Sequence, residues 1–407
     1  MASPLSGIRV LDLSRVLAGP WCSQTLADLG ADVIKVERPG TGDDTRAWGP
    51  PYARGEDGNP TQESAYFLSA NRGKRSITVE LSHPAGQSLL RDLAATSDVL
   101  IENFKVGGLA KYGLDYATLA ALNPRLIYCS ITGFGQTGPY RDRAGYDFMI
   151  QGLGGLMSVT GVPDGQPGAG PMKVGVALAD VLSGLYASTA ILAALNRRHA
   201  TGTGDHIDIA LLDVQVACLA NQAMNYLASG TPPSRLGNAH PNIVPYEAFA
   251  TSDGHVILAV GNDSQFRAFC DASGKPEWSQ DARFATNPQR VAHRDVLVAA
   301  IATVMRTATT ANWVTKLNAA GVPCGPVNDI ADVFDDPHVQ ARGLRLDLPH
   351  ETAGHVPSVA SPIRYADTRL PAPSAPPTLG QHTVDVLRDV LRLTDQEIDR
   401  LRTAGAI

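Results

Sequence analysis

The sequence predicts an α/β fold built on a parallel sheet. The first observation is a strand–helix–strand pattern near the N-terminus. Residues 7–13 (GIRVLDL) are short, apolar and rich in β-branched residues, as in a buried strand, and residues 32–37 (DVIKVE) have the same character. Residues 20–29 between them favour a helix, which Gly30 ends. Such a unit requires parallel strands covered by helices.

The second observation is that this alternation continues. Residues 84–96 favour a helix with Pro84 near its first turn, and residues 99–103 (VLIEN) favour a strand. Residues 115–122 favour a helix, and residues 125–135 favour a strand that runs into a glycine-containing loop. Alternating strands and helices are typical of the α/β class.

The third observation is a change of pattern in the second half of the chain. Residues 136–173 are rich in loop-forming residues and precede a long helix, 180–198; residues 206–227 begin as a strand and continue as a helix. Residues 229–245 interrupt the alternation and indicate a domain boundary, after which the chain to about residue 327 mixes hairpin-like strands with helices, as in a smaller α+β unit. A Pro-rich connector at 370–378 precedes one or two final helices in 383–403.

Composition narrows the functional class. The chain has 407 residues, 44% of them apolar, and a net charge of −6, which argues against a nucleic-acid-binding domain. No apolar run reaches the roughly 18 residues of a membrane span, and the first residues lack the features of a signal peptide. The five cysteines and ten histidines show no metal-binding spacing. We therefore expect a reduced cytoplasmic protein without a metal site or a membrane partner.

Asp180 is the most informative residue. It lies between an apolar run, 174–179, and a helix pattern rich in small residues. Partly dehydrated carboxylates at such positions can act as nucleophiles, but aspartate is also a favoured N-cap. Residues alone leave both interpretations open, and Asp147 and Asp208 allow similar structural interpretations.

The first strand–helix turn, SRVLAGPWC, does not match a dinucleotide-binding loop. Such a loop needs three glycines in a GxGxxG pattern, and only Gly19 is present. The sequence also contains no GxSxG elbow and no P-loop. Basic residues could serve a polyanionic ligand or a solvated surface, and they include Arg38, Arg46, Arg72, Lys74, Arg75, Lys105 and Lys111. Arg38 directly follows a strand, at the edge where open α/β sheets bind ligands.

Several blocks together resemble the class III CoA transferases, the family of formyl-CoA, carnitine and succinate–glutarate CoA-transferases. They are GIRVLDLSRVLAGPWCSQTLADLGADVIKVERPGTGDDTRAW, NRGKRSITVEL, IENFKVGGLAKYGL, GQTGPYRDRAGYDFMIQGLGGLMSVTG, VALADVLSGLYA, GVPCGPV and LGQHTVDVL. The resemblance covers nearly the whole chain. It implies a Rossmann-like large domain formed by residues 1–225 and 331–407, a small α+β domain at 226–330, and an interlocked homodimer.

The resemblance also implies the reaction. Asp180 matches the family's nucleophilic aspartate, which attacks an acyl-CoA thioester and forms an aspartyl anhydride and then an aspartyl-CoA thioester. The acyl donor is expected to be succinyl-CoA and the acceptor a small dicarboxylic acid such as glutarate. A carnitine-like or aromatic acceptor is the alternative.

The resemblance also implies which positions of this sequence contact coenzyme A. They are Leu17, Ala18, Arg38, Asn103, Phe104, Lys105, Lys111, Arg143, Tyr146 and Asp147. The family often has a glutamine at the position of Leu17, so a side-chain donor to the reacting carbonyl is lost here. Arg46, Arg72 and His240 are candidates to hold the distal carboxylate, and His240 and Asn242 are candidates for acceptor contacts. Alternatively, 237–246 is a turn fixed by Pro241 and Pro245.

Other functions remain alternatives. The related α-methylacyl-CoA racemases use a histidine where this chain has Tyr146, and tyrosine is a poor base near neutral pH. A nicotinamide dehydrogenase would need the missing glycine pattern. A non-enzymatic CoA-binding protein would not need Asp180.

Overall fold

A computed structural model describes residues 2–407 and divides the chain into two units. The first unit contains residues up to 156 together with 173–229 and 338–407, and the second contains 157–172 and 230–337. Residues 157–172, expected in the large domain, thus belong to the second unit.

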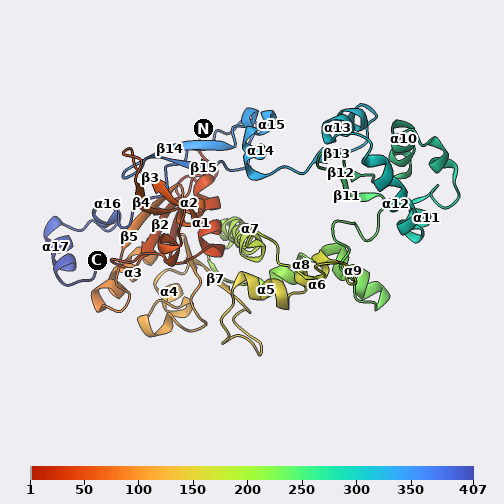
Figure 1. The fold of residues 1–407 in the computed structure, drawn as a ribbon. Coiled ribbons are helices and arrows are strands. Elements are labelled where there is room, and N and C mark those ends of the chain that lie inside the picture. Colours follow the sequence, from red (N-terminus) through yellow and green to blue (C-terminus); the bar gives the residue numbers. More distant parts are fainter. Residues whose placement is uncertain (1) are drawn as a thin grey trace. The chain divides into compact units, whose positions relative to one another are not determined.

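The first unit is built on one six-stranded sheet (Figure 1). Its strands are β1 (Arg9–Asp12), β2 (Asp32–Glu37), β5 (Lys74–Thr78), β6 (Val99–Glu102), β7 (Ile127–Thr132) and β10 (Asp205–Ala210). Every neighbouring pair is parallel, and the spatial order is β10-β7-β6-β1-β2-β5. The prediction of an α/β fold with a parallel sheet is therefore confirmed. Counted along the chain, the order is that of a doubly wound sheet, and it reverses between β1 and β6.

Helices cover both faces of this sheet, because its strands are apolar on both sides. On one face lie α1 (Ala18–Asp28), α5 (Asp147–Leu153), α7 (Leu178–Thr201) and α8 (Leu211–Ala217), with Val10, Ile101 and Ile131 in the core beneath them. On the other face lie α3 (Pro84–Ala95), α4 (Tyr116–Leu122), α16 (Thr383–Asp389) and α17 (Asp395–Thr403), packed on Leu11, Leu100 and Tyr128.

Helix α7 packs closely on α1 (Figure 1). Its buried face includes Gly184, Ala187 and Ile191, spaced as one helical stripe. A Cβ atom on Gly184 would lie 2.7 Å from the carbonyl oxygen of Ala18, so this contact requires glycine. In the described part of the chain, α7 is the one helix long and apolar enough to cross a membrane, although serine, threonine and glycine interrupt its apolar residues. One side of this helix packs on α1 and β7 in the core of the first unit.

The other elements of the first unit are short. They are η1 (Asp44–Ala47), β3 (Tyr52–Arg54), β4 (Pro60–Ser64), α2 (Ala65–Ser69), η2 (Ala110–Tyr112), α9 (Ala220–Ser229), β14 (Arg345–His350) and β15 (Gly354–Val359), while α6 (Leu156–Val159) and α15 (Pro337–Ala341) span the junctions with the second unit.

The second unit has its own core around an antiparallel sheet of order β11-β12-β13. Its elements are β8 (Gly161–Val162), β9 (Gly170–Pro171), β11 (Tyr246–Ala250), β12 (His255–Ala259), α10 (Asp263–Ser273), η3 (Pro276–Gln280), α11 (Asn287–Ala292), α12 (Arg294–Met305), α13 (Thr310–Ala319), β13 (Cys324–Pro326) and α14 (Ile330–Asp335). Strands β11 and β12 form the hairpin that the sequence indicates.

Candidate active site

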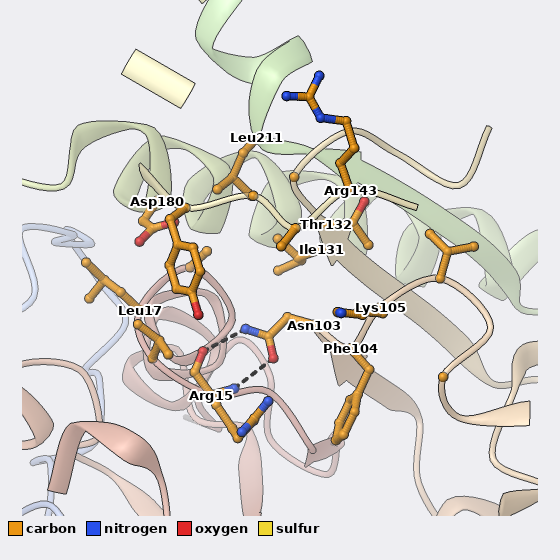
Figure 2. A pocket seen from close by; sticks show the side chains of 18 of the residues that line it. Arg15, Leu17, Asn103, Phe104, Lys105, Ile131, Thr132, Arg143, Asp180 and Leu211 are labelled. Atoms are coloured by element: carbon orange, nitrogen blue, oxygen red, sulfur yellow. Dashed lines mark hydrogen bonds between the residues drawn. The ribbon is translucent and has the colours of Figure 1, made fainter. Parts of the chain in front are cut away.

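The turn from β1 to α1 lies where the strand order of the sheet reverses, the position at which open α/β sheets bind ligands. Asn103, directly after β6, holds this turn across the crevice. Its side-chain oxygen accepts from Arg15 N at 2.9 Å and its amide nitrogen donates to Arg15 O at 2.7 Å (Figure 2). Val16 has a φ of 73°, which is unusual for a β-branched residue. The turn is therefore held in one specific conformation.

Buried charges support the same turn. Ser14 N donates to Asp12 at 3.0 Å, and Val16 N donates to Asp43 at 3.2 Å. Asp43 forms an ion pair with Lys35 at 2.9 Å, and Asp12 lies 3.3 Å from Lys74 Nζ, all four side chains being fully buried.

This crevice opens into a cavity of about 460 Å³ (Figure 2). Its wall consists of the β1–α1 turn, the segments that follow β6 and β7, the segment before α5 and the first turn of α7. The lining residues include Arg15, Leu17, Ala18, Asp44, Asn103, Phe104, Lys105, Lys111, Thr132, Arg141, Arg143, Tyr146, Asp180 and Leu211. A Cβ on Gly133 would lie 2.6 Å from the Cα of Gly145, so glycine lets the segment after β7 and the segment before α5 cross closely.

Asp180 lies in the wall of this cavity without a partner. Within residues 2–407 its carboxylate forms no ion pair and receives no hydrogen bond. Burial, and then the negative charge of Asp147, raise the pKa of Asp180 from 3.8 to about 7. An unpaired, poorly hydrated carboxylate beside a cavity is suited to attack a bound electrophile.

Asp180 is not the N-cap of α7, so the capping interpretation is wrong. The helix begins earlier than expected, with Ala177 as N-cap and Asp180 in the first turn. A hydrogen bond from Ala179 N to Asp147 Oδ1 at 2.8 Å supplies the cap from α5.

Cations line the same cavity. Arg15 pairs with Asp44 at 3.1 Å, and Arg141 lies 3.6 Å from Asp142. No ion pair joins Lys105, Lys111 or Arg143 to a carboxylate within residues 2–407. Unneutralised cations around a cavity favour an anionic ligand such as a phosphate.

The predicted site residues divide into two groups. The structure brings Asp180 together with Leu17, Ala18, Asn103, Phe104, Lys105, Lys111, Arg143 and Tyr146 in one cavity. Asp147 lies behind this wall, in contact with α7. Arg38 does not line the cavity, and its side chain is 73% exposed, 3.7 Å from Glu80.

The expected role of Arg46 and Arg72 in holding a substrate carboxylate needs correction. The side chain of Arg46 is 9% exposed and pairs with Glu37 at 2.7 Å, and Arg72 is buried and pairs with Asp28 at 2.5 Å. Neither side chain lines the cavity. Because both guanidinium groups are already paired with carboxylates of the protein, neither is available to bind a substrate carboxylate.

His240 and Asn242 lie in the second unit. Asn242 N donates to His240 Nδ1 at 3.1 Å, and Asn287 Nδ2 donates to Asn242 O at 2.9 Å. Arg294 donates to the carbonyl of His240 at 2.7 Å. These contacts give 237–246 a defined local turn, and the acceptor role of the two residues stays a prediction.

Sequence reasoning missed Arg15 and Asp44 as lining residues. Arg15 stands three residues after β1 ends, so the preference of ligands for the carboxyl ends of strands could have indicated it. Asp44 forms an ion pair with Arg15, which lies 29 residues away in the sequence, so no local signal indicates it.

The pKa of Asp180 should make stability depend on pH. Below pH 3.8 the carboxyl group of Asp180 is protonated in both the folded and the unfolded chain. Between pH 3.8 and about 7 the folded chain keeps a proton that the unfolded chain loses, so the stability of the fold falls as the pH rises. The side chain in Asp180→Asn cannot ionise. The free energy of unfolding of this variant, relative to that of the wild type, should therefore increase by roughly 2–3 kcal/mol from about pH 5 to about pH 8. Urea unfolding of both proteins at the two pH values measures this gain. An equal difference at both would contradict the raised pKa.

Comparison with known proteins identifies the family. The pattern of CoA-transferase family III matches residues 5–383. Succinate–glutarate CoA-transferase of Agrobacterium fabrum is 56% identical over 387 residues, covering 95% of this chain and 96% of that protein. Succinyl-CoA:glutarate CoA-transferase of Mus musculus is 44% identical over 404 residues, covering 99% of this chain and 90% of that protein.

A solved structure agrees with this relationship. The crystal structure of a CAIB/BAIF family protein from Brucella suis is 52% identical and matches with a TM-score of 0.84, covering 96% of this chain and 100% of that one. The resemblance seen in the sequence motifs is thus confirmed, and the chain belongs to CoA-transferase family III.

Proposed function

We propose that this enzyme transfers CoA from succinyl-CoA to a dicarboxylic acid such as glutarate, with Asp180 as the covalent nucleophile. The observation that carries the proposal is an unpaired carboxylate in the same cavity as three unneutralised cations. The substrates are supported by the names of the two relatives from Agrobacterium fabrum and Mus musculus.

In the first half of the reaction, the Asp180 carboxylate attacks the thioester carbonyl of succinyl-CoA. The C–S bond breaks, CoA leaves as thiolate, and an aspartyl–succinyl anhydride remains. The thiolate then attacks the Asp180 carbonyl of this anhydride, the C–O bond breaks, and succinate leaves. Asp180 now carries CoA as a thioester.

The second half reverses these steps with the acceptor. A glutarate carboxylate attacks the aspartyl thioester, releases the thiolate and forms an aspartyl–glutaryl anhydride. Attack of the thiolate on the glutaryl carbonyl yields glutaryl-CoA and frees the Asp180 carboxylate. No net proton is gained or lost.

Each addition places negative charge on a carbonyl oxygen, which needs hydrogen-bond donors. The N-terminus of α1 is the candidate, because no side chain caps it and Ala18 lines the cavity. Its free N–H groups form the positive end of the helix dipole. Leu17 has no polar side chain, so backbone groups would supply this stabilisation.

The cations are suited to the phosphates of CoA. Lys105, Lys111 and Arg143 line the cavity, and charge-assisted hydrogen bonds to phosphate are among the stronger polar contacts. The Arg143 guanidinium also lies 4.4 Å from the centre of the Tyr140 ring. This stacking would orient it before the ligand binds.

We also propose that the enzyme is a homodimer with a Rossmann-like large domain. Large apolar side chains are exposed on α5, α7, α8 and α9, and they are Phe148, Leu153, Leu185, Tyr186, Val216, Met224, Tyr226 and Leu227. Exposed apolar surface of this kind is typical of protein interfaces. The interlocking implied by the family resemblance and the cytoplasmic location stay predictions.

The covalent role of Asp180 can be tested by trapping. Wild-type protein incubated with succinyl-CoA and hydroxylamine or borohydride should carry a modification at Asp180 detectable by mass spectrometry. Asp180→Ala should show no adduct and lose at least ~10³-fold in kcat, as expected for a covalent nucleophile. The exposed Asp213 on α8 offers a control, since Asp213→Ala should keep both adduct and rate. Full transfer by Asp180→Ala would exclude this mechanism.

The phosphate role of Lys111 can be tested by charge removal. Lys111→Ala should raise KM for succinyl-CoA about tenfold, the loss of about 1.4 kcal/mol of binding, with kcat changed less than about threefold. Arg54→Ala, at the exposed last residue of β3 and outside the cavity, should leave KM unchanged. An unchanged KM for Lys111→Ala would remove this lysine from the CoA site.

The acceptor can be identified with a panel of acids. With succinyl-CoA as donor, glutarate should give the highest kcat/KM, ahead of oxalate, formate and acetate, with product acyl-CoA measured by liquid chromatography. A preference for a monocarboxylate would contradict the dicarboxylate assignment while leaving the covalent mechanism standing.

A further inference from the structure

We infer that Gln151 is a positioning residue, which together with Asp147 fixes the segment that delivers Asp180 to the cavity. This inference rests on the proposed function of Asp180. It concerns groups that do not line the cavity and would not touch the substrate.

Gln151 on α5 is fully buried, and both ends of its amide are used. Its oxygen accepts from Val174 N at 2.8 Å. Its nitrogen donates to Asp147 Oδ2 at 2.8 Å and to Val176 O at 3.4 Å. One side chain therefore joins a carboxylate on its own helix to the backbone directly before α7.

Asp147 completes the connection. Its Oδ2 is held by Gln151, while its Oδ1 accepts from Ala179 N at 2.8 Å, in the first turn of α7 and next to Asp180. Gln151 thus fixes the orientation of the carboxylate that caps the catalytic helix.

The segment has few other supports. The chain leaves the first unit after Leu156 and returns at Lys173, so residues 174–179 are the return path to α7. A Cβ atom on Gly175 would have no atom within 4 Å, and Val176 is 59% exposed. Apart from the bond of Lys173 to its neighbour Val174 and the bonds of helix α7 itself, the hydrogen bonds of 174–179 within the described residues end on Gln151 or Asp147. Losing Gln151 should let this segment, and Asp180 with it, move.

Gln151 also acts on charge. Burial, and then the negative charge of Asp147, raise the pKa of Asp180, and the Gln151 N–H donates to that same Asp147 carboxylate at 2.8 Å. Without this N–H, the negative charge of Asp147 acts on Asp180 with less compensation, so ionisation of Asp180 requires a higher pH. Replacing Asp147 by neutral Asn has the opposite effect, and Asn can still accept from Ala179 N.

Other titratable groups on the elements packed against α7 do not compete for this role. Burial raises the pKa of Cys22 on α1 to about 12, and burial also raises the pKa of Cys129 on β7 well above its usual value. Asp213 on α8 is exposed. His206 and Asp208 on β10 alternate with Ile207, which packs in the core beneath α7, so they face the opposite side of the sheet. The pKa of Tyr66 on α2 is raised, first by burial and then by the negative charge of Asp180.

The test compares the pH profile of kcat/KM for four proteins. Relative to wild type, Gln151→Leu should lower kcat about 10- to 100-fold, with KM for succinyl-CoA changed less than about threefold, and should move the acid limb to higher pH. Asp147→Asn should move that limb to lower pH by roughly one unit. In the double variant the charge is already gone, so its limb should coincide with that of Asp147→Asn.

Gln24→Leu is the matched control for a structural role. Gln24 on α1 is also buried and bonded to the chain, through Arg72 N at 3.0 Å and Ser69 O at 3.3 Å. This variant should lose stability without moving the acid limb. If Gln151→Leu does not fold, Gln151→Met, which keeps the side-chain length, replaces it.

The outcomes separate this inference from the proposed function. Full activity of Asp180→Ala would overturn the proposed function itself. An inactive Asp180→Ala combined with wild-type kcat and an unmoved acid limb in Gln151→Leu would overturn only the role of Gln151. A shared shift in Gln151→Leu and Gln24→Leu would mean that Gln151 is merely structural.

Discussion

The site depends on the buried ion pair between Lys35 and Asp43. The two fully buried groups lie 2.9 Å apart, and Lys35 Nζ also donates to Ser14 O at 3.0 Å while Asp43 accepts from Val16 N. Burial alone would raise the pKa of Asp43, but Lys35 and Thr45 outweigh it and lower the pKa to about 2. Removing one partner of such a pair typically costs ~3–5 kcal/mol, against about 0–1 kcal/mol for a surface pair. These bonds hold Val16 at its unusual φ and aim the start of α1 at the cavity.

Several buried carboxylates near the sheet have ion-pair partners, whereas the reacting carboxylate of Asp180 has none within residues 2–407. Asp12, Asp43 and Glu37 are buried, and each is paired with a lysine or arginine. Asp180 has neither an ion pair nor a hydrogen bond within residues 2–407. The cations of the cavity wall lie instead where a phosphate could neutralise them. Asp12, Asp43 and Glu37 thus have their charges neutralised, whereas Asp180 and the cations Lys105, Lys111 and Arg143 of the cavity wall have no ion-pair partner within residues 2–407.

The sequence predicted the features that depend on local patterns, and it failed where distant residues decide. Strands 7–13, 32–37 and 99–103 follow from apolar runs, and motifs pointed to Asp180. Arg46 and Arg72 looked free because their partners, Glu37 and Asp28, lie 9 and 44 residues away and meet them only in the fold. Likewise, Asp180 looked like a cap because the true cap, Asp147, is 32 residues upstream of Ala179. A basic or acidic residue shows its type in the sequence, but its partner only in the structure.

Because Asp147, and not Asp180, accepts a hydrogen bond from the first turn of α7, the pKa of Asp180 stays raised. A carboxylate at the N-cap would accept hydrogen bonds from backbone N–H groups, which stabilise its charge, lower its pKa and weaken it as a nucleophile. Asp180, in the first turn but without such bonds, keeps a pKa of about 7. A carboxylate with that pKa attacks a thioester more readily than one with a pKa near 4, because nucleophilicity rises with basicity. In the proposed cycle Asp180 must also leave from the final anhydride, and a leaving group with a pKa near the working pH departs without a proton donor. The cap that Asp147 on α5 provides for α7 thus leaves Asp180 able to act as a nucleophile in one step and as a leaving group in another.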